Sequence, residues 1–171
     1  MIVVKYKFNP STYENYLPVF NSEYTDYTTS DVNNEDGTIT RTIESDSLPT
    51  SMRFGQAWIS EENGATNKSK SLLEILDMNT SNLTNMISMF RYCINLTSIT
   101  CNWNTSEVTD VYCMFQYCSS LTQLDVSNWN TSNITVAQAL FHNCSSLTTL
   151  DVSNWNTSKV TNMGSIFYGC S

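Results

Sequence analysis

Positively charged side chains are scarce in this 171-residue chain. Only 14% of its residues are charged, and eight Lys and Arg face sixteen Asp and Glu, which gives a net charge of −8. Binding to nucleic acid relies on cations that displace phosphate counterions, so this composition argues against a nucleic-acid partner. It argues equally against an anionic membrane surface. No apolar run approaches the length of a membrane span, so membrane insertion is not expected.

Groups that could carry out catalysis are equally few. His142 is the single histidine, so neither a Ser/His/Asp nor a Cys/His triad can form within this chain. The five glycines are dispersed and form no phosphate-binding loop, and no CxxC pair or second histidine suggests zinc. We therefore expect no enzyme, no cofactor and no metal site.

A secretory signal is also missing from the start of the chain. MIVVKYKFNP contains neither a sustained hydrophobic stretch nor a cleavage site. Either the protein leaves its cell by another route, or Met1 replaces a native leader.

What the chain does contain is a repeat of about 26 residues. LTQLDVSNWNTSN (121–133) returns as LTTLDVSNWNTSK (147–159), and FQYCSSL, FHNCSSL and FYGCS keep the same interval. A fixed period of this length is typical of arrays in which each unit buries its apolar face against its neighbours. The residues expected in this repeated core are Phe90, Phe115, Phe141, Phe167, Cys93, Cys118, Cys144, Cys170, Trp103, Trp129 and Trp155.

The six cysteines could pair, because stacked units bring equivalent positions close together. Four of them occupy one position of the repeat, and their side chains would then all point inward. Cys101 takes a position held elsewhere by Val126 and Val152. Buried free thiols that act as small hydrophobic groups are the better interpretation. The tryptophans could likewise form a ligand platform, but their identical places in the repeat favour the core.

The sequence divides into two segments. Residues 1–62 show no 26-residue period, and a strand at 2–8 and a hairpin around Asp36-Gly37 predict a small β-rich module, with one more strand at 52–59. A polar linker covers 63–71. Residues 72–171 form about four units, and the last stops within a unit at Ser171, which indicates a fragment of a longer array or an end covered by a partner.

Each unit of the array combines two kinds of element. LxxLDV predicts a short strand with Leu and Val inward, and a polar SNWNTS turn follows it. Residues 108–118 have apolar spacings of three, three, one and three, which predict a short helix. The expected fold class is therefore an α/β repeat solenoid of short parallel strands and short helices, preceded by the β-rich module.

The phrase LDVSNWNTSxVTxMxxxFxxCSSL resembles the BspA-like leucine-rich repeats of bacterial surface proteins across residues 72–171. The resemblance implies a right-handed solenoid, an extracellular adhesin or interaction role, and no catalytic residues. Similar repeats occur in bacteriophage structural proteins. Residues 1–62 resemble no known family.

The outward positions of the expected strands form the candidate binding surface. Their short polar side chains suit hydrogen bonding to a protein or glycan, although any array needs a polar outer face. An aspartate column at 77, 125 and 151 could be structural, contact a partner or hold calcium. The candidate surface comprises Ser98, Thr100, Gln123, Asp125, Ser127, Thr149, Asp151 and Ser153.

These features predict a non-enzymatic structural and recognition protein, possible as a homo-oligomer. Residues 1–62 would dock to a capsid, tail or cell envelope, and the array would contact a surface protein or glycan. The favoured setting is the virion surface, as a bacteriophage head-fibre, tail or decoration protein. The alternative is an extracellular fragment of a secreted bacterial surface adhesin. Residues 1–62 could instead be only a cap that covers the first apolar layer.

Overall fold

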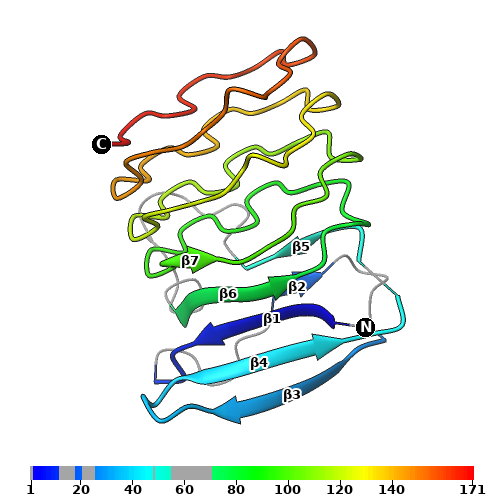
Figure 1. The fold of residues 1–171 in the computed structure, drawn as a ribbon, viewed down its shortest axis with the longest axis vertical. Helices are drawn as coiled ribbons and strands as arrows, with labels where there is room; N and C mark the ends of the chain where they lie inside the picture. The colour runs from blue at the N-terminus through cyan, green and yellow to red at the C-terminus, as the bar shows by residue number, and fades with distance from the viewer. Residues whose placement is uncertain (1, 12–17, 21–25, 48, 55–70) are drawn as a thin grey trace.

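A computed structural model describes residues 2–11, 18–20, 26–47, 49–54 and 71–171. Five strands form one sheet in the order β3-β4-β1-β6-β7, and β2 pairs with β5 beside it. From β7 onward the chain forms irregular coils that stack on the sheet (Figure 1). The strands are β1 (Ile2–Phe8), β2 (Val19–Phe20), β3 (Thr28–Asn33), β4 (Ile39–Glu44), β5 (Met52–Arg53), β6 (Leu72–Met78) and β7 (Ser98–Ile99).

Strand β1 lies in the middle of the sheet, and its residues alternate between apolar and polar. Val4, Tyr6 and Phe8 are fully buried on one face, while Lys5 and Lys7 are half-buried on the other. β1 pairs antiparallel with β4 on one side and with β6 on the other. The predicted strand at 2–8 is confirmed.

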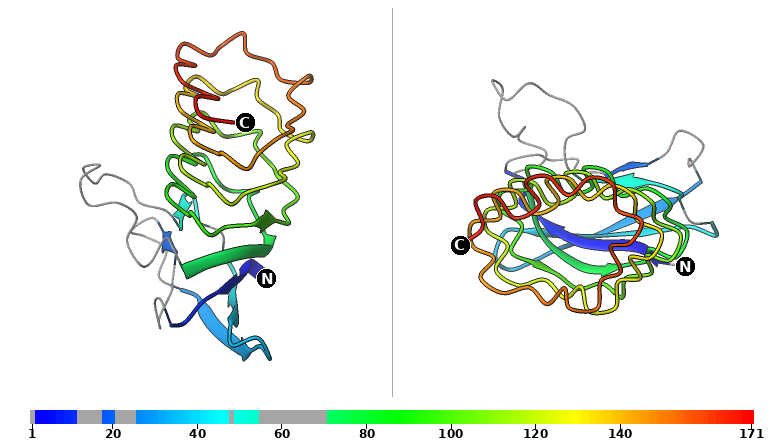
Figure 2. Two further views of the ribbon diagram at one scale, coloured as in Figure 1. Left: turned by 90° about the vertical axis from the view of Figure 1, so that its left-hand side faces the viewer. Right: turned by 90° about the horizontal axis from the view of Figure 1, so that it is seen from above.

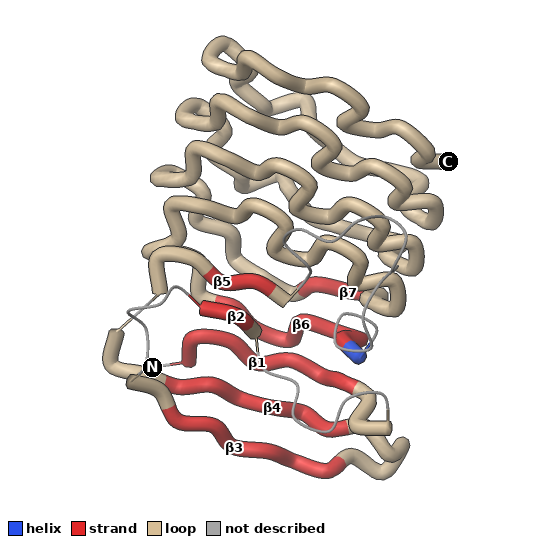
Figure 3. Tube along the Cα trace, turned by 180° about the vertical axis from the view of Figure 1, so that it is seen from behind, coloured by secondary structure: helices blue, strands red, loops and turns tan. Residues whose placement is uncertain are grey.

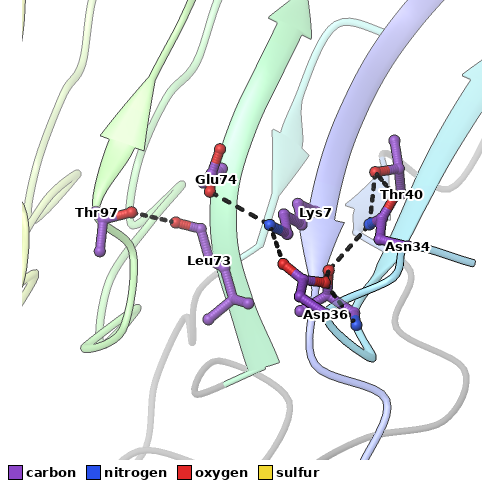
Figure 4. A network of polar contacts seen from close by, with 8 residues as sticks. Lys7, Asn34, Asp36, Thr40, Leu73, Glu74 and Thr97 are labelled. Carbon is purple, nitrogen blue, oxygen red and sulfur yellow. Dashed lines mark hydrogen bonds and ion pairs between the residues drawn. The ribbon is translucent and has the colours of Figure 1, made fainter.

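The hairpin predicted around Asp36-Gly37 is also confirmed. β3 and β4 pair antiparallel over six residues, and Gly37 adopts a φ of 78° in the turn, which costs glycine little. Lys7 Nζ lies 2.7 Å from Asp36 Oδ2 and 3.8 Å from Glu74, so it links the turn to β6 (Figure 4). Of the strand predicted at 52–59, β5 covers the first two residues, and 55–59 lie outside the described residues.

The predicted α/β repeat solenoid is wrong. The structure is mostly β, with a five-stranded sheet, and helical backbone in its described part is limited to Ser71 (Figure 3). β6 and β7 pair in parallel, whereas the strands expected at 121–126 and 147–152 do not form. The predicted linker lies outside the described residues except for Ser71, and the division into domains stays a prediction.

The segment predicted as a helix at 108–118 is a run of tight turns. Cys113 and Tyr117 have φ of 54° and 63°, which a right-handed helix does not allow. The amide of Met114 donates to Val111 O (3.1 Å), as in a turn, but the amide of Cys113 donates to Gln138 O of the next coil (3.1 Å). Turns of three residues give apolar spacings close to those of a helix, which explains the error.

Hydrogen bonds between coils follow one side of the stack. Every second amide of 109–117 donates to a carbonyl of an adjacent coil, and so does every second amide of 135–143. Isolated parallel bridges mark the same side and run through Ser51, Asn85, Asp110, Val136 and Asn162. These bonds satisfy much of the coil backbone without regular strands.

One apolar core runs through sheet and coils. Phenylalanine rings stack along it with centroids 5.4–5.6 Å apart and interplanar angles of 2–9°. The first ring of this column is Phe54, which follows β5, so the N-terminal segment provides its lowest layer. The column consists of Phe54, Phe90, Phe115, Phe141 and Phe167.

The predicted core residues lie around this column. Trp103 and Trp129 are buried, and Trp155 is half-buried in the last coil. Phe90, Phe115 and Phe141 are fully buried, whereas Phe167 in the last coil is 43% exposed. Burial therefore decreases toward the final layer.

Candidate functional site

A groove of about 840 Å³ crosses three successive coils on their exposed side. Each coil contributes three residues, and the outer two are exposed while the middle one is partly or mostly buried. The floor consists of Ile99, Leu124 and Leu150. One rim consists of Ser98, Gln123 and Thr149, and the other of Thr100, Asp125 and Asp151.

The groove forms where hydrogen bonding between coils is weakest. Among the described residues, no backbone hydrogen bond links 122–125 to 148–151, although the opposite side of the same coils is bonded throughout. The alternation LxxLDV places Leu121 and Val126 in the core and leaves Asp125 outside. The middle residue, Leu124, remains 8% exposed and is reachable from the groove.

The two aspartates of the groove are held as carboxylates. The Ser127 hydroxyl, followed by its backbone amide at 2.9 Å from Oδ1, lowers the pKa of Asp125 below its usual range. Ser153 lowers the pKa of Asp151 in the same way. The groove lining contains no Lys, Arg or His, so both negative charges face solvent.

Six of the eight predicted surface residues line this groove. The other two, Ser127 and Ser153, are exposed in the turns that follow and serve as hydrogen-bond donors to the aspartates. The floor was missed as part of the site because its apolar residues were assigned only to the core. The exposure of these inward residues depends on the distance between neighbouring coils. The repeat pattern in the sequence does not predict that distance.

The aspartate column predicted from the repeat does not come together as one site. Asp77 belongs to β6, where it lies opposite Lys5 of β1 in the strand register, and it lines a separate cavity of about 350 Å³ with Asn79 and Asn104. Thr100 occupies the equivalent place between it and Asp125. The described residues contain no group of three or more His, Cys, Asp or Glu arranged to hold a metal ion.

His142 lies away from the groove, in a stack of aromatic rings. Its ring centroid is 5.6 Å from that of Tyr117 and 5.0 Å from that of Tyr168. The residue is half-buried, and its Nδ1 is a buried atom without a hydrogen-bond partner among the described residues. His142 therefore packs between the rings of Tyr117 and Tyr168.

All six cysteines are free thiols in the structure. Burial raises the pKa of Cys118 well above its ordinary value and that of Cys144 to about 12. The thiol of Cys118 donates to Phe90 O (3.1 Å) and that of Cys144 to Phe115 O (3.1 Å). These contacts tie each coil to the one before it.

A known family model matches most of the chain. Residues 61–171 match a family model described as "Mycoplasma protein of unknown function, DUF285", and the match covers well over half of the chain. No curated protein matches the chain. No solved structure matches it either. No helix in the described part of the chain is long and apolar enough to cross a membrane.

Proposed function

The chain belongs to the DUF285 family, and we propose that it is a non-enzymatic recognition protein that binds its partner through the groove. The observation that supports this most directly is the gathering of six outward residues of the repeat on one concave surface. Binding sites are typically concave, with an apolar lining and a few placed polar groups.

The apolar core beneath the groove favours recognition because its side chains are closely packed. Phe115 and Phe141 are fully buried directly inside these coils, and Trp129 is 4% exposed. Ser, Thr and Asp side chains lose little conformational entropy when a ligand orders them. Together these features lower the cost of binding.

The sheet end of the molecule suits attachment to a larger assembly. β3 lies at the far end from the last coil, and the coils extend away from it (Figures 1 and 2). If the sheet end were held by an assembly, the groove would stay accessible. We propose a virion surface as the setting, with a bacterial cell surface as the alternative, in keeping with the resemblance to BspA-like repeats.

Groove variants test the recognition role. We expect Gln123→Lys with Thr149→Lys to abolish binding of the labelled chain to arrays of extracellular proteins and glycans. Thr109→Lys with Thr135→Lys makes the same change in charge at exposed positions on the hydrogen-bonded side, and it should leave binding intact. Equal binding by both double variants would rule out the groove as the recognition surface.

The setting can be tested separately by mass spectrometry of the native source. Peptides from this chain in purified virions would support the virion proposal. Their recovery only from a cell-envelope fraction would contradict it and support the surface adhesin.

A further inference from the structure

The spacing of the coils limits which ligand can repeat its contacts along the groove. Trp129 and Trp155 stack with centroids 5.6 Å apart and an interplanar angle of 5°, and the phenylalanine column has the same interval. Trp103 and Trp129 keep a similar centroid distance of 5.5 Å, although their planes are inclined by 68°. The coils are joined by parallel bridges, and strands paired in this way lie about 4.8 Å apart. We therefore expect equivalent groove residues, such as Asp125 and Asp151, to repeat at roughly 5 Å along the stack.

The pitch of an α-helix is closer to this interval than the side-chain spacing of an extended strand is. The helix has a pitch of about 5.4 Å, so side chains one turn apart meet successive coils in register. In an extended strand, side chains on one face are about 6.6 Å apart and lose register after one or two coils. The groove spans three coils, which corresponds to about two helical turns.

The lining of the groove matches one kind of helix. Ile99, Leu124 and Leu150 form an apolar strip along the stack, flanked on one side by the carboxylates of Asp125 and Asp151. The ion pairs formed by the described residues lie between β1, the β3–β4 hairpin and β6, and none involves these two aspartates. A ligand with apolar groups beside positive charges would contact the apolar floor and form ion pairs with the two aspartates of the rim.

We infer that the groove binds an amphipathic basic helix of a partner protein, lying along the stack with Lys or Arg one turn apart opposite Asp125 and Asp151. This inference rests on the proposed function, because it takes the groove to be the recognition surface. Helix-in-groove binding through residues spaced at i, i+3, i+4 and i+7 is a common mode of recognition.

A glycan fits the lining less well than this helix. Sugars are commonly held against the faces of aromatic rings, and the groove lining contains no aromatic residue. A neutral glycan would also leave both carboxylates without a cation. Glycan binding is nevertheless kept as an outcome of the test.

The probe is an 18-residue helical peptide with leucines every third or fourth residue and lysines along one edge of that stripe. Its control has the same composition, with the lysines moved to the face of the helix opposite the leucine stripe. Affinities for the full chain are measured by fluorescence anisotropy at low and high salt. A set of neutral oligosaccharides is measured in parallel.

We expect the patterned peptide to bind more tightly than its control, and to bind more weakly as salt increases. Asp125→Asn with Asp151→Asn keeps the side-chain shape and should weaken binding about five- to tenfold. Glu44→Gln with Glu107→Gln removes two exposed charges outside the groove and should change affinity less than twofold.

Equal affinity for both peptides, or equal weakening by both double variants, would overturn the inference. Groove-dependent binding of an oligosaccharide or array target, without binding of the patterned peptide, would overturn the helix and leave the proposed function standing. Array binding that does not depend on the groove would contradict the proposed function itself.

Discussion

The sheet and the coils both bury one apolar core, but different interactions stabilise the two regions. In the sheet, long antiparallel pairs are supplemented by charge: Arg41 is buried, makes two 2.6 Å hydrogen bonds to Asp31 and lies 5.1 Å from the Phe8 ring centroid. The coils contain no ion pair among the described residues. They rely instead on ring columns, buried thiols and hydrogen bonds between neighbours.

This difference shows how an aperiodic segment can support a periodic one. A repeated unit buries its apolar face only against another unit, so its first layer needs a cover. β1 pairs directly with β6, and Phe54 stacks on Phe90 with centroids 5.5 Å apart. These contacts favour the interpretation that the N-terminal segment is a cap that shares its core with the coils. A docking role for this segment would be a second function beside capping.

The largest effect is expected from removing the sheet. A chain that begins at Gly55 should lose cooperative folding of the coils, because Leu72, Ile75 and Phe90 would be exposed. Circular dichroism and thermal melting measure this. A cooperative melt close to that of the full chain would show that the two regions fold independently.

Within the phenylalanine column, the cost of truncation should follow burial. Phe115→Ala leaves a cavity at a fully buried site and should destabilise the chain by about 3–5 kcal/mol. Phe167→Ala, at the 43% exposed ring, should cost about 1 kcal/mol. Urea unfolding followed by tryptophan fluorescence provides both values, and similar costs would contradict a decrease in packing along the stack.

Alkaline pH should destabilise the coils through their buried thiols. A raised pKa in the folded state means that the stabilisation is complete below the unfolded value of about 8.5 and is lost as pH rises toward the folded value. For Cys144, whose folded pKa is about 12, the loss approaches 1.4 kcal/mol per pH unit above about pH 9.

Urea unfolding of Cys144→Ala between pH 7 and 10.5 checks this expectation. The variant should show a shallower decline with pH than the wild-type chain, even though it is less stable at pH 7. Parallel declines would contradict the role of this thiol.

The smallest effect is expected from the ion pair on the surface of the sheet. Hydrogen bonds from Lys7 and Thr38 lower the pKa of Asp36, and Asp36 raises the pKa of Lys7. The stabilisation by Asp36 is therefore present above the unfolded carboxyl pKa of about 4 and is lost as pH falls through the folded value. The contribution of Lys7 is lost only as pH rises above about 10.

Lys7→Met should reduce the loss of stability at acid pH and leave the alkaline decline in stability of the coils almost unchanged. Thermal melts from pH 2.5 to 7 measure this, with Lys5→Met as the matched control on the same strand. An identical acid profile for wild type and Lys7→Met would exclude the pair as a source of stability.

The local sequence was sufficient for β1 and for the β3–β4 hairpin because their signals act over short distances, whereas the pairing of β1 with β6 was not predicted. The alternation of Val4, Tyr6 and Phe8 predicted β1, and Asp36-Gly37 predicted the hairpin. Six of the eight predicted surface residues line the groove, because strict repetition places equivalent residues at equivalent positions in successive coils. The helix at 108–118 failed because three-residue turns and helices share an apolar spacing.

By itself, the sequence determined that coils would stack at a constant interval, because Phe, Trp and Cys recur every 25 or 26 residues. Only the tertiary structure decided which backbone groups would pair. The residues Ser88, Cys113 and Ala139 have positive φ values, and their amides donate to the next coil, which competes with the hydrogen bonding of a helix. The opposite side, where 122–125 and 148–151 are not paired, opens into the groove because coil separation depends on contacts between units and not on any one unit.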